Sequence, residues 1–172
     1  MLEDLLTKNK AAILKRWFEL AVEVYPLDTQ KFVKTHKDPF TNPVGACIAG
    51  GTEKIFDLLV RGVDCRSEES CQAMDKILRI RAVQDITAAE AVGFVFFLKK
   101  AVRETLAKEI RQQQLAEELA EFETRVDSMA LVAFNVFMRC REQLYEMKAN
   151  EIRNRTGRML ERVCRKYGIS YE

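Results

Sequence analysis

The sequence offers few side chains for acid–base or metal chemistry. His36 is the single histidine among the 172 residues, and it stands in the run THKDPF beside a proline. A haem iron usually takes a histidine on a pocket helix, and a serine nucleophile needs a basic partner. We therefore expect a turn or surface role for His36, and we expect no catalytic residue, no metal and no cofactor. A haem-dependent gas sensor is kept as an alternative.

One glycine-rich run superficially imitates a phosphate loop. Residues 45–52, GACIAGGT, resemble the pattern GxxxxGK[ST], but Gly51 replaces the lysine and no strand precedes the run. We interpret Gly45, Ala49 and Gly50 instead as small residues that let another helix approach closely.

Composition indicates one globular domain, with 48% hydrophobic and 31% charged residues. No apolar run approaches the roughly 18 residues that span a bilayer, and the start MLEDLLTKNK is too acidic and polar for a secretory signal. The five cysteines contain no CxxC pair, so we interpret them as reduced thiols, although Cys65 and Cys71 are close enough in sequence for a redox pair. A cytoplasmic location is expected.

Prolines and capping residues divide the chain into helices. All three prolines lie between residues 26 and 43, so the chain after Pro43 is free to be helical. Pro26 should end a first helix, Asn42 should cap another, and Thr87 with Glu90 should form a capping box. Before residue 110 we expect helices over about residues 1–25, 29–35, 43–61, 67–84 and 88–108.

The helix over 88–108 is expected to be central. Its residues 94–98, FVFFL, project around the whole circumference of a helix. Such a helix must be covered on all sides.

A very long helix is expected from about Leu115 to Met147. One seam of apolar residues follows coiled-coil-like steps of three and four, from Leu119 to Met147. A second apolar stripe lies on another face, and one helix can bury two faces only if two bodies flank it. We therefore predict a homodimer through this second stripe, which consists of Leu131, Phe134, Met138 and Tyr145.

Arg81 falls inside the apolar arc of its helix, whereas Arg79 belongs to the polar arc. A guanidinium facing the core must be paired or hydrated, because an uncompensated buried charge costs several kcal/mol. We favour a buried ion pair or a cap on helix carbonyls, with contact to an anionic ligand as the alternative. If a small ligand binds, we expect its pocket near Trp17, Tyr25, Arg81 and Phe97.

The end of the chain is rich in charge. Residues 139–166 hold nine Lys or Arg against four Glu, and the acidic residues fall at helical pairing distances. We interpret this segment as a solvated helix that packs on a partner helix. Because the net charge of the chain is only +2, nucleic-acid binding through this tail is the alternative rather than the main hypothesis.

Three segments together carry a family resemblance: ILKRWFELAVEVYP at 13–26, DPFTNPVG at 38–45 and RIRAVQDITAAEAVGFVFFLKKAVRETL at 79–106. Over about residues 5 to 110 the chain resembles the RsbRD N-terminal domain, named for a co-antagonist of the bacterial general-stress kinase RsbT. The resemblance implies a dimeric, globin-like sensor domain without haem, whose cavity is filled by side chains. It carries over no phosphorylation site.

Together these observations predict an all-α, globin-like helical bundle at residues 1–147, with a C-terminal helical extension at 148–172. The predicted function is that of a non-enzymatic, cytoplasmic stress-signalling module. It would act through a regulatory protein partner, as a homodimer and without membrane insertion.

Overall fold

The computed structural model describes residues 1–35 and 38–169, and every regular element within them is an α-helix. In chain order the helices are α1 (Leu2–Lys8), α2 (Lys10–Ala21), α3 (Leu27–Thr35), α4 (Pro43–Val60), α5 (Glu68–Ala82), α6 (Ala88–Gly93), α7 (Phe97–Thr105), α8 (Ala107–Gln112) and α9 (Ala116–Tyr167). The predicted all-α class is confirmed. The globin-like arrangement and the boundary after residue 147 stay predictions.

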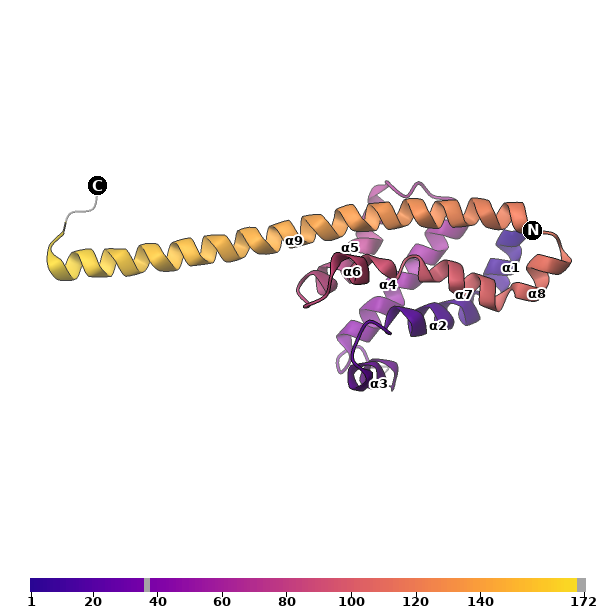
Figure 1. Cartoon of the computed structure of the whole chain (residues 1–172), viewed down its shortest axis with the longest axis horizontal. Coiled ribbons are helices and arrows are strands. Elements are labelled where there is room, and N and C mark those ends of the chain that lie inside the picture. The colour runs from indigo at the N-terminus through magenta and orange to yellow at the C-terminus, as the bar shows by residue number, and fades with distance from the viewer. Residues whose placement is uncertain (36–37, 170–172) are drawn as a thin grey trace.

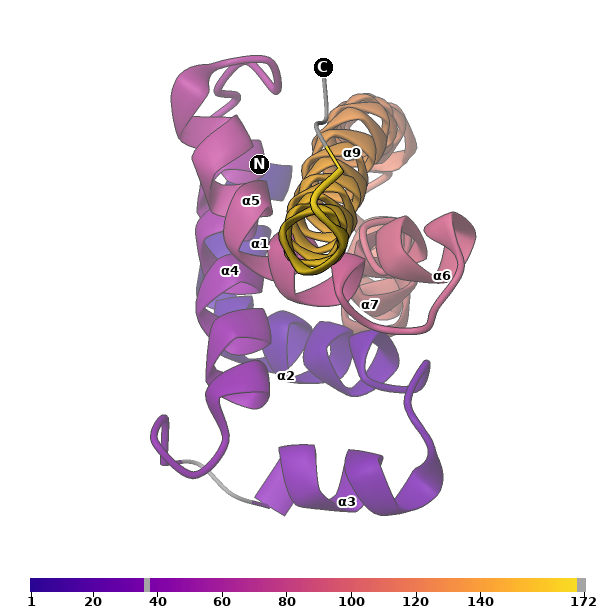
Figure 2. The same ribbon diagram turned by 90° about the vertical axis from the view of Figure 1, so that its left-hand side faces the viewer.

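The shorter helices form a bundle beneath one half of α9, and the other half of α9 projects away from it (Figure 1). Helix α5 packs along the first half of α9, α4 packs against α5, and α2 contacts both α4 and α7. In the view along α9, α3 lies at the edge of the bundle, away from α9 (Figure 2). A membrane-crossing helix is not found in the part of the chain that the structure describes.

Helix starts follow the predicted capping signals. The Asn42 side chain accepts a backbone amide at the start of α4, where Pro43 is the first helical residue. Ser67 caps α5 in the same way, and Thr87 and Glu90 form the reciprocal capping box of α6. Each of these side chains satisfies backbone amides that have no partner within the helix.

The expectation of one unbroken helix before Pro26 is wrong. Helix α1 ends and α2 begins at Asn9, whose φ of −101° and ψ of 13° depart from the helix. Its Nδ2 donates to the Leu5 carbonyl at 2.9 Å, which shows how asparagine competes with the backbone for helical hydrogen bonds. The apolar arc still enters one core, because its members up to Leu20 are buried: Leu2, Leu6, Ile13, Trp17 and Leu20.

The expectation of a fully covered helix over 88–108 is also wrong. The segment forms two helices, α6 and α7, and the amides of residues 95–99 donate to carbonyls three positions earlier. This is 3₁₀ winding, with about three residues per turn. It places Phe94 and Leu98 in the core but leaves Phe96 and Phe97 45% and 38% exposed. A helical projection with about 3.6 residues per turn could not separate these residues.

The predicted seam of α9 is buried along the bundle. Its buried members are Leu119, Phe122, Val126, Met129, Ala133, Val136 and Cys140. Met147, the last predicted member, is 63% exposed because the bundle ends before it. One uninterrupted helix of 52 residues therefore has a packed half and a projecting half.

Candidate functional site

Arg81 lies on the core-facing side of α5, as its helical position predicts, and is only 1% exposed. Its Nη2 donates to the Ala21 carbonyl at 2.8 Å, and its Nη1 donates to the carbonyls of Glu90 and Ala91 at 3.0 and 3.2 Å. These carbonyls lie in the last turns of α2 and α6, where intrahelical donors are lacking. Arg81 therefore caps the C-terminal ends of two helices at once.

Aromatic rings surround the Arg81 guanidinium. Its central carbon lies 4.7 Å from the ring centroid of Phe94 and 5.9 Å from that of Tyr25. Trp17 stacks on Phe94, and Trp17 Nε1 donates to the Phe94 carbonyl at 2.6 Å. The Tyr25 hydroxyl donates to Gln84 Oε1 at 3.1 Å. Burial lowers the pKa of Arg81, and the neighbouring Tyr25 opposes that shift.

The structure brings together three of the four predicted pocket residues. Trp17, Tyr25 and Arg81 meet around Phe94, which the sequence analysis did not single out as a pocket residue, whereas Phe97 lies on the surface of α7. Within the described chain, Arg81 Nε has no hydrogen-bond acceptor. The rings and helix carbonyls around it form a packed cluster that joins α2, α5 and α6. A ligand at these four residues stays a prediction.

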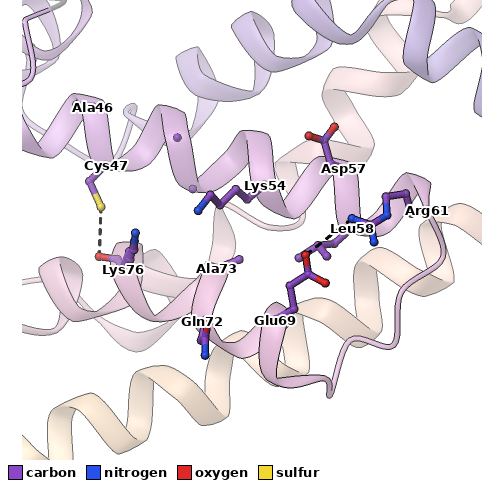
Figure 3. A pocket seen from close by; sticks show the side chains of 12 residues that line it. Ala46, Cys47, Lys54, Asp57, Leu58, Arg61, Glu69, Gln72, Ala73 and Lys76 are labelled. Carbon is purple, nitrogen blue, oxygen red and sulfur yellow. Dashed lines mark hydrogen bonds and ion pairs between the residues drawn. The ribbon is translucent and has the colours of Figure 1, made fainter.

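Two hollows adjoin α4 on the bundle surface. One, of about 410 Å³, lies between α2, α3 and α4 and has a mainly apolar lining that includes Phe18 and Ala49. The other, of about 540 Å³, lies between α4 and α5 and is lined in part by Lys54 and Lys76 (Figure 3). Sequence reasoning missed these two lysines, because they lie on different helices and no spacing relates them.

The glycine-rich run lies inside α4, so it forms no phosphate loop. A Cβ atom at Gly51 would come within 2.5 Å of the Ile77 side chain on α5, so close helix approach does depend on glycine there. A Cβ at Gly50 would meet nothing within 4 Å. The expectation that Gly50 permits close packing is therefore wrong, and its neighbour has that role.

The four predicted dimer-face residues share an exposed side of α9. On the single chain, Leu131 is 70% exposed and Phe134, Met138 and Tyr145 are also open to solvent. The bundle ends beside them, where Arg141 donates to the Ala82 carbonyl at 3.0 Å and to the Tyr145 hydroxyl at 2.7 Å. The charged segment after Arg141 is an exposed helix in which basic residues outnumber acidic ones. Nucleic-acid binding by this segment stays a prediction.

The reactive side chains form no constellation among the described residues. All five cysteines are free: the Cys65 thiol donates to the Arg125 carbonyl at 3.6 Å, and the Cys71 thiol to the Arg66 carbonyl at 4.0 Å. Burial raises the pKa of the Cys65 thiol, as it does for Cys47 and Cys140.

No group of three or more metal-ligating side chains occurs in residues 1–35 and 38–169. His36 lies outside the described residues.

The model of one protein family matches residues 11–152: the RsbT co-antagonist protein rsbRD N-terminal domain. The matched segment runs from α2 into the projecting half of α9, so it includes the Arg81 cluster and the four exposed residues of α9. No curated protein and no solved structure gave a match. Because the family model covers most of the sequence, the chain belongs to the family of the RsbT co-antagonist protein rsbRD N-terminal domain, a regulatory domain of stress signalling.

Proposed function

We propose that the protein is a cytoplasmic, non-enzymatic regulatory module that forms a homodimer through α9 and acts by contact with another signalling protein. Membership of the family supports the regulatory role. Five free cysteines fit a reducing compartment. The observation that carries the dimer is a row of exposed apolar side chains on α9.

This row follows a seven-residue repeat. Its members are Leu131, Met138, Tyr145, Ile152 and Met159, and all are exposed on the single chain. The residues four positions after each member of the row give the heptad spacing, in which steps of four and three residues alternate. They are Asn135, Glu142, Ala149, Thr156 and Val163. Heptad spacing lets two helices wind around each other, and here one of the two seam positions is apolar throughout while the other is mixed, with Ala149 and Val163 as its apolar members. The row begins beside the bundle and continues along the projecting half.

The charges beside the row favour a parallel arrangement of the two copies. Arg141, Lys148, Arg155 and Arg162 flank the row on one side, again at seven-residue intervals. In an antiparallel pair the basic flank of one helix would face the same basic flank of the partner helix, and the like charges would repel each other. In a parallel pair it faces the other flank of the partner, which holds Glu146 between Arg139 and Arg153, and Glu146 can pair with the basic flank.

A second copy would also stabilise the projecting half of α9. Most helical stability in proteins comes from packing of an apolar face rather than from intrinsic propensity. The last residue of α9 that the bundle buries is Cys140, so residues 141–167 have no such packing against the part of one chain that the structure describes.

Light scattering coupled to size exclusion tests the dimer, and α9 offers a matched pair of methionines. Met138 and Met147 are nine residues apart, about two and a half helical turns, and so lie on opposite faces. We expect twice the mass of one chain for the wild type and for Met147→Glu, and the mass of one chain for Met138→Glu at micromolar concentration. A monomeric wild type, or equal dissociation of both variants, would contradict the proposal.

A further inference from the structure

We propose that the groove between α4 and α5 binds a small organic anion. A carboxylate or phosphate group would lie between Lys54 and Lys76, and a short apolar body would lie over Gly50 and Gly51. The groove is separate from the exposed row of α9. This inference therefore does not depend on the proposed dimer.

The groove has the size and the walls of a small-molecule site. Its volume of about 540 Å³ falls within the range of roughly 300–1,000 Å³ typical of ligand pockets. Ala46, Leu58 and Ala73 contribute apolar lining. Figure 3 shows Lys54 on α4 and Lys76 on α5 extending into the space between the two helices.

The charges in the groove are not balanced within the protein. Its two carboxylates already pair with cations, Asp57 at 2.8 Å and Glu69 at 3.8 Å. Lys54 and Lys76, by contrast, have no carboxylate oxygen within 4.0 Å among the described residues. Both lysine side chains are exposed, so their ammonium groups can turn toward a ligand in the groove. An anion between them would accept charge-assisted hydrogen bonds from both.

A second observation concerns Gly50, which lines the same groove. Glycine inside a helix is destabilising relative to alanine, because it loses more conformational freedom on folding. Among the described residues no neighbour requires glycine at this position, since a Cβ there would meet nothing within 4 Å. Gly93 and Gly157 are equally open, but Gly50 lines the groove, where it leaves the helix backbone open to a ligand. Gly51 differs, because the Ile77 side chain occupies the space of its Cβ.

The test follows backbone amide resonances of the ¹⁵N-labelled full chain during titration with three probes. Phenyl phosphate and sodium benzoate each join an anionic group to an apolar ring, and inorganic phosphate has no ring. We expect saturable shifts of the Gly50 and Gly51 amides with at least one aryl anion, and the tighter of the two identifies the anionic group. Inorganic phosphate should bind more weakly than phenyl phosphate. Equal affinity would overturn the apolar part of the proposal.

Variants locate the binding. Lys54→Ala and Lys76→Ala should each weaken the affinity about tenfold, the loss expected for one charge-assisted hydrogen bond. Lys108→Ala, which removes an exposed lysine on α8, should leave it unchanged.

Gly50→Leu should abolish the shifts by filling the groove, and the amide spectrum itself shows whether this variant is folded. Gly157→Leu is its matched control, because a Cβ at that helical glycine also meets nothing within 4 Å. The proposal is overturned if neither aryl anion shifts these amides at up to about 10 mM, the limit of weak binding. Shifts that persist in folded Gly50→Leu would overturn it as well.

Discussion

The two halves of α9 belong to one helix but obtain their order from different sources. Residues up to Cys140 present an apolar seam to α5, α6 and the helices around them. Residues after Arg141 present a thinner apolar row that none of the residues 1–35 and 38–169 covers. The sequence patterns of the two halves look alike, since both repeat apolar residues at seven-residue intervals. Periodicity therefore shows that a face is to be buried, but not which body buries it.

The largest expected effect is the loss of stability when the packing of the first half of α9 is disrupted. Phe122 is fully buried, so Phe122→Ala should lower the free energy of unfolding by about 3–5 kcal/mol, through lost burial and the cavity left behind. Phe134, 46% exposed, is its matched control on the same helix. In the Met138→Glu background, where we expect a single chain, Phe134→Ala should cost less than about 1 kcal/mol. Urea denaturation measures both, and similar losses would contradict the contrast.

A second pair tests the same contrast within α5. Arg81→Met should destabilise the fold by about 2–4 kcal/mol, because buried carbonyls at the ends of α2 and α6 lose their donors. Arg79→Met removes an exposed ion pair with Asp75 and should cost less than about 1 kcal/mol. Thermal and urea unfolding measure both variants. If Arg81→Met is as stable as Arg79→Met, the double cap is not a main support of the bundle.

Much of the fold could be predicted from the sequence because its signals are local. Asn42 before Pro43, and Thr87 with Glu90, act within one helical turn, so the chain itself contains the whole cause. Arg81 could be placed in the core for a similar reason, since its helical arc is apolar. A cap on helix carbonyls was one of the two predicted roles, but the helices that Arg81 caps could not be predicted, because they lie elsewhere in the chain.

The errors arose where tertiary packing overrides a regular helix. The tight 3₁₀ turn at residues 95–99 moves Phe96 and Phe97 out of the core, although the run of apolar residues gives no sign of it. The groove lysines, Lys54 and Lys76, were missed because only the packing of α4 on α5 brings them to one place. For the same reason, the choice between Gly50 and Gly51 as the close-packing residue required the structure.

Gly50 and Gly51 give the next prediction, because substitution by alanine should change stability in opposite directions at these two positions. Gly51→Ala should destabilise by about 1–3 kcal/mol, since its Cβ would overlap the buried Ile77 side chain. Gly50→Ala should stabilise by up to about 1 kcal/mol, because its Cβ meets open space and alanine favours the helix. Urea denaturation of the ligand-free chain compares the two. A loss of stability in Gly50→Ala would show that the groove wall itself needs glycine.

The smallest effect is a difference in reactivity between two thiols of α9, one in each half. Cys140 is buried and its thiol donates to Asp75 Oδ1 at 3.8 Å, whereas Cys164 is partly exposed. Burial, and then the Asp75 charge, raise the pKa of Cys140, so its reactive thiolate is scarcer near pH 8. Each unit by which the pKa of a thiol rises above the pH lowers its thiolate fraction about tenfold. Burial also restricts the access of the reagent to the thiol, which slows the reaction further.

We therefore expect iodoacetamide to alkylate Cys164 well before Cys140 in the native protein, as mass spectrometry of the labelled peptides would show. In concentrated guanidinium chloride the two rates should converge, because unfolding removes both the burial and the neighbouring carboxylate. Cys164 directly follows Val163 of the proposed seam but points away from it, so dimer formation should not protect it. Equal native rates would mean that the bundle opens around Cys140 on the time scale of labelling, and that the packed half of α9 is less firmly held than its burial indicates.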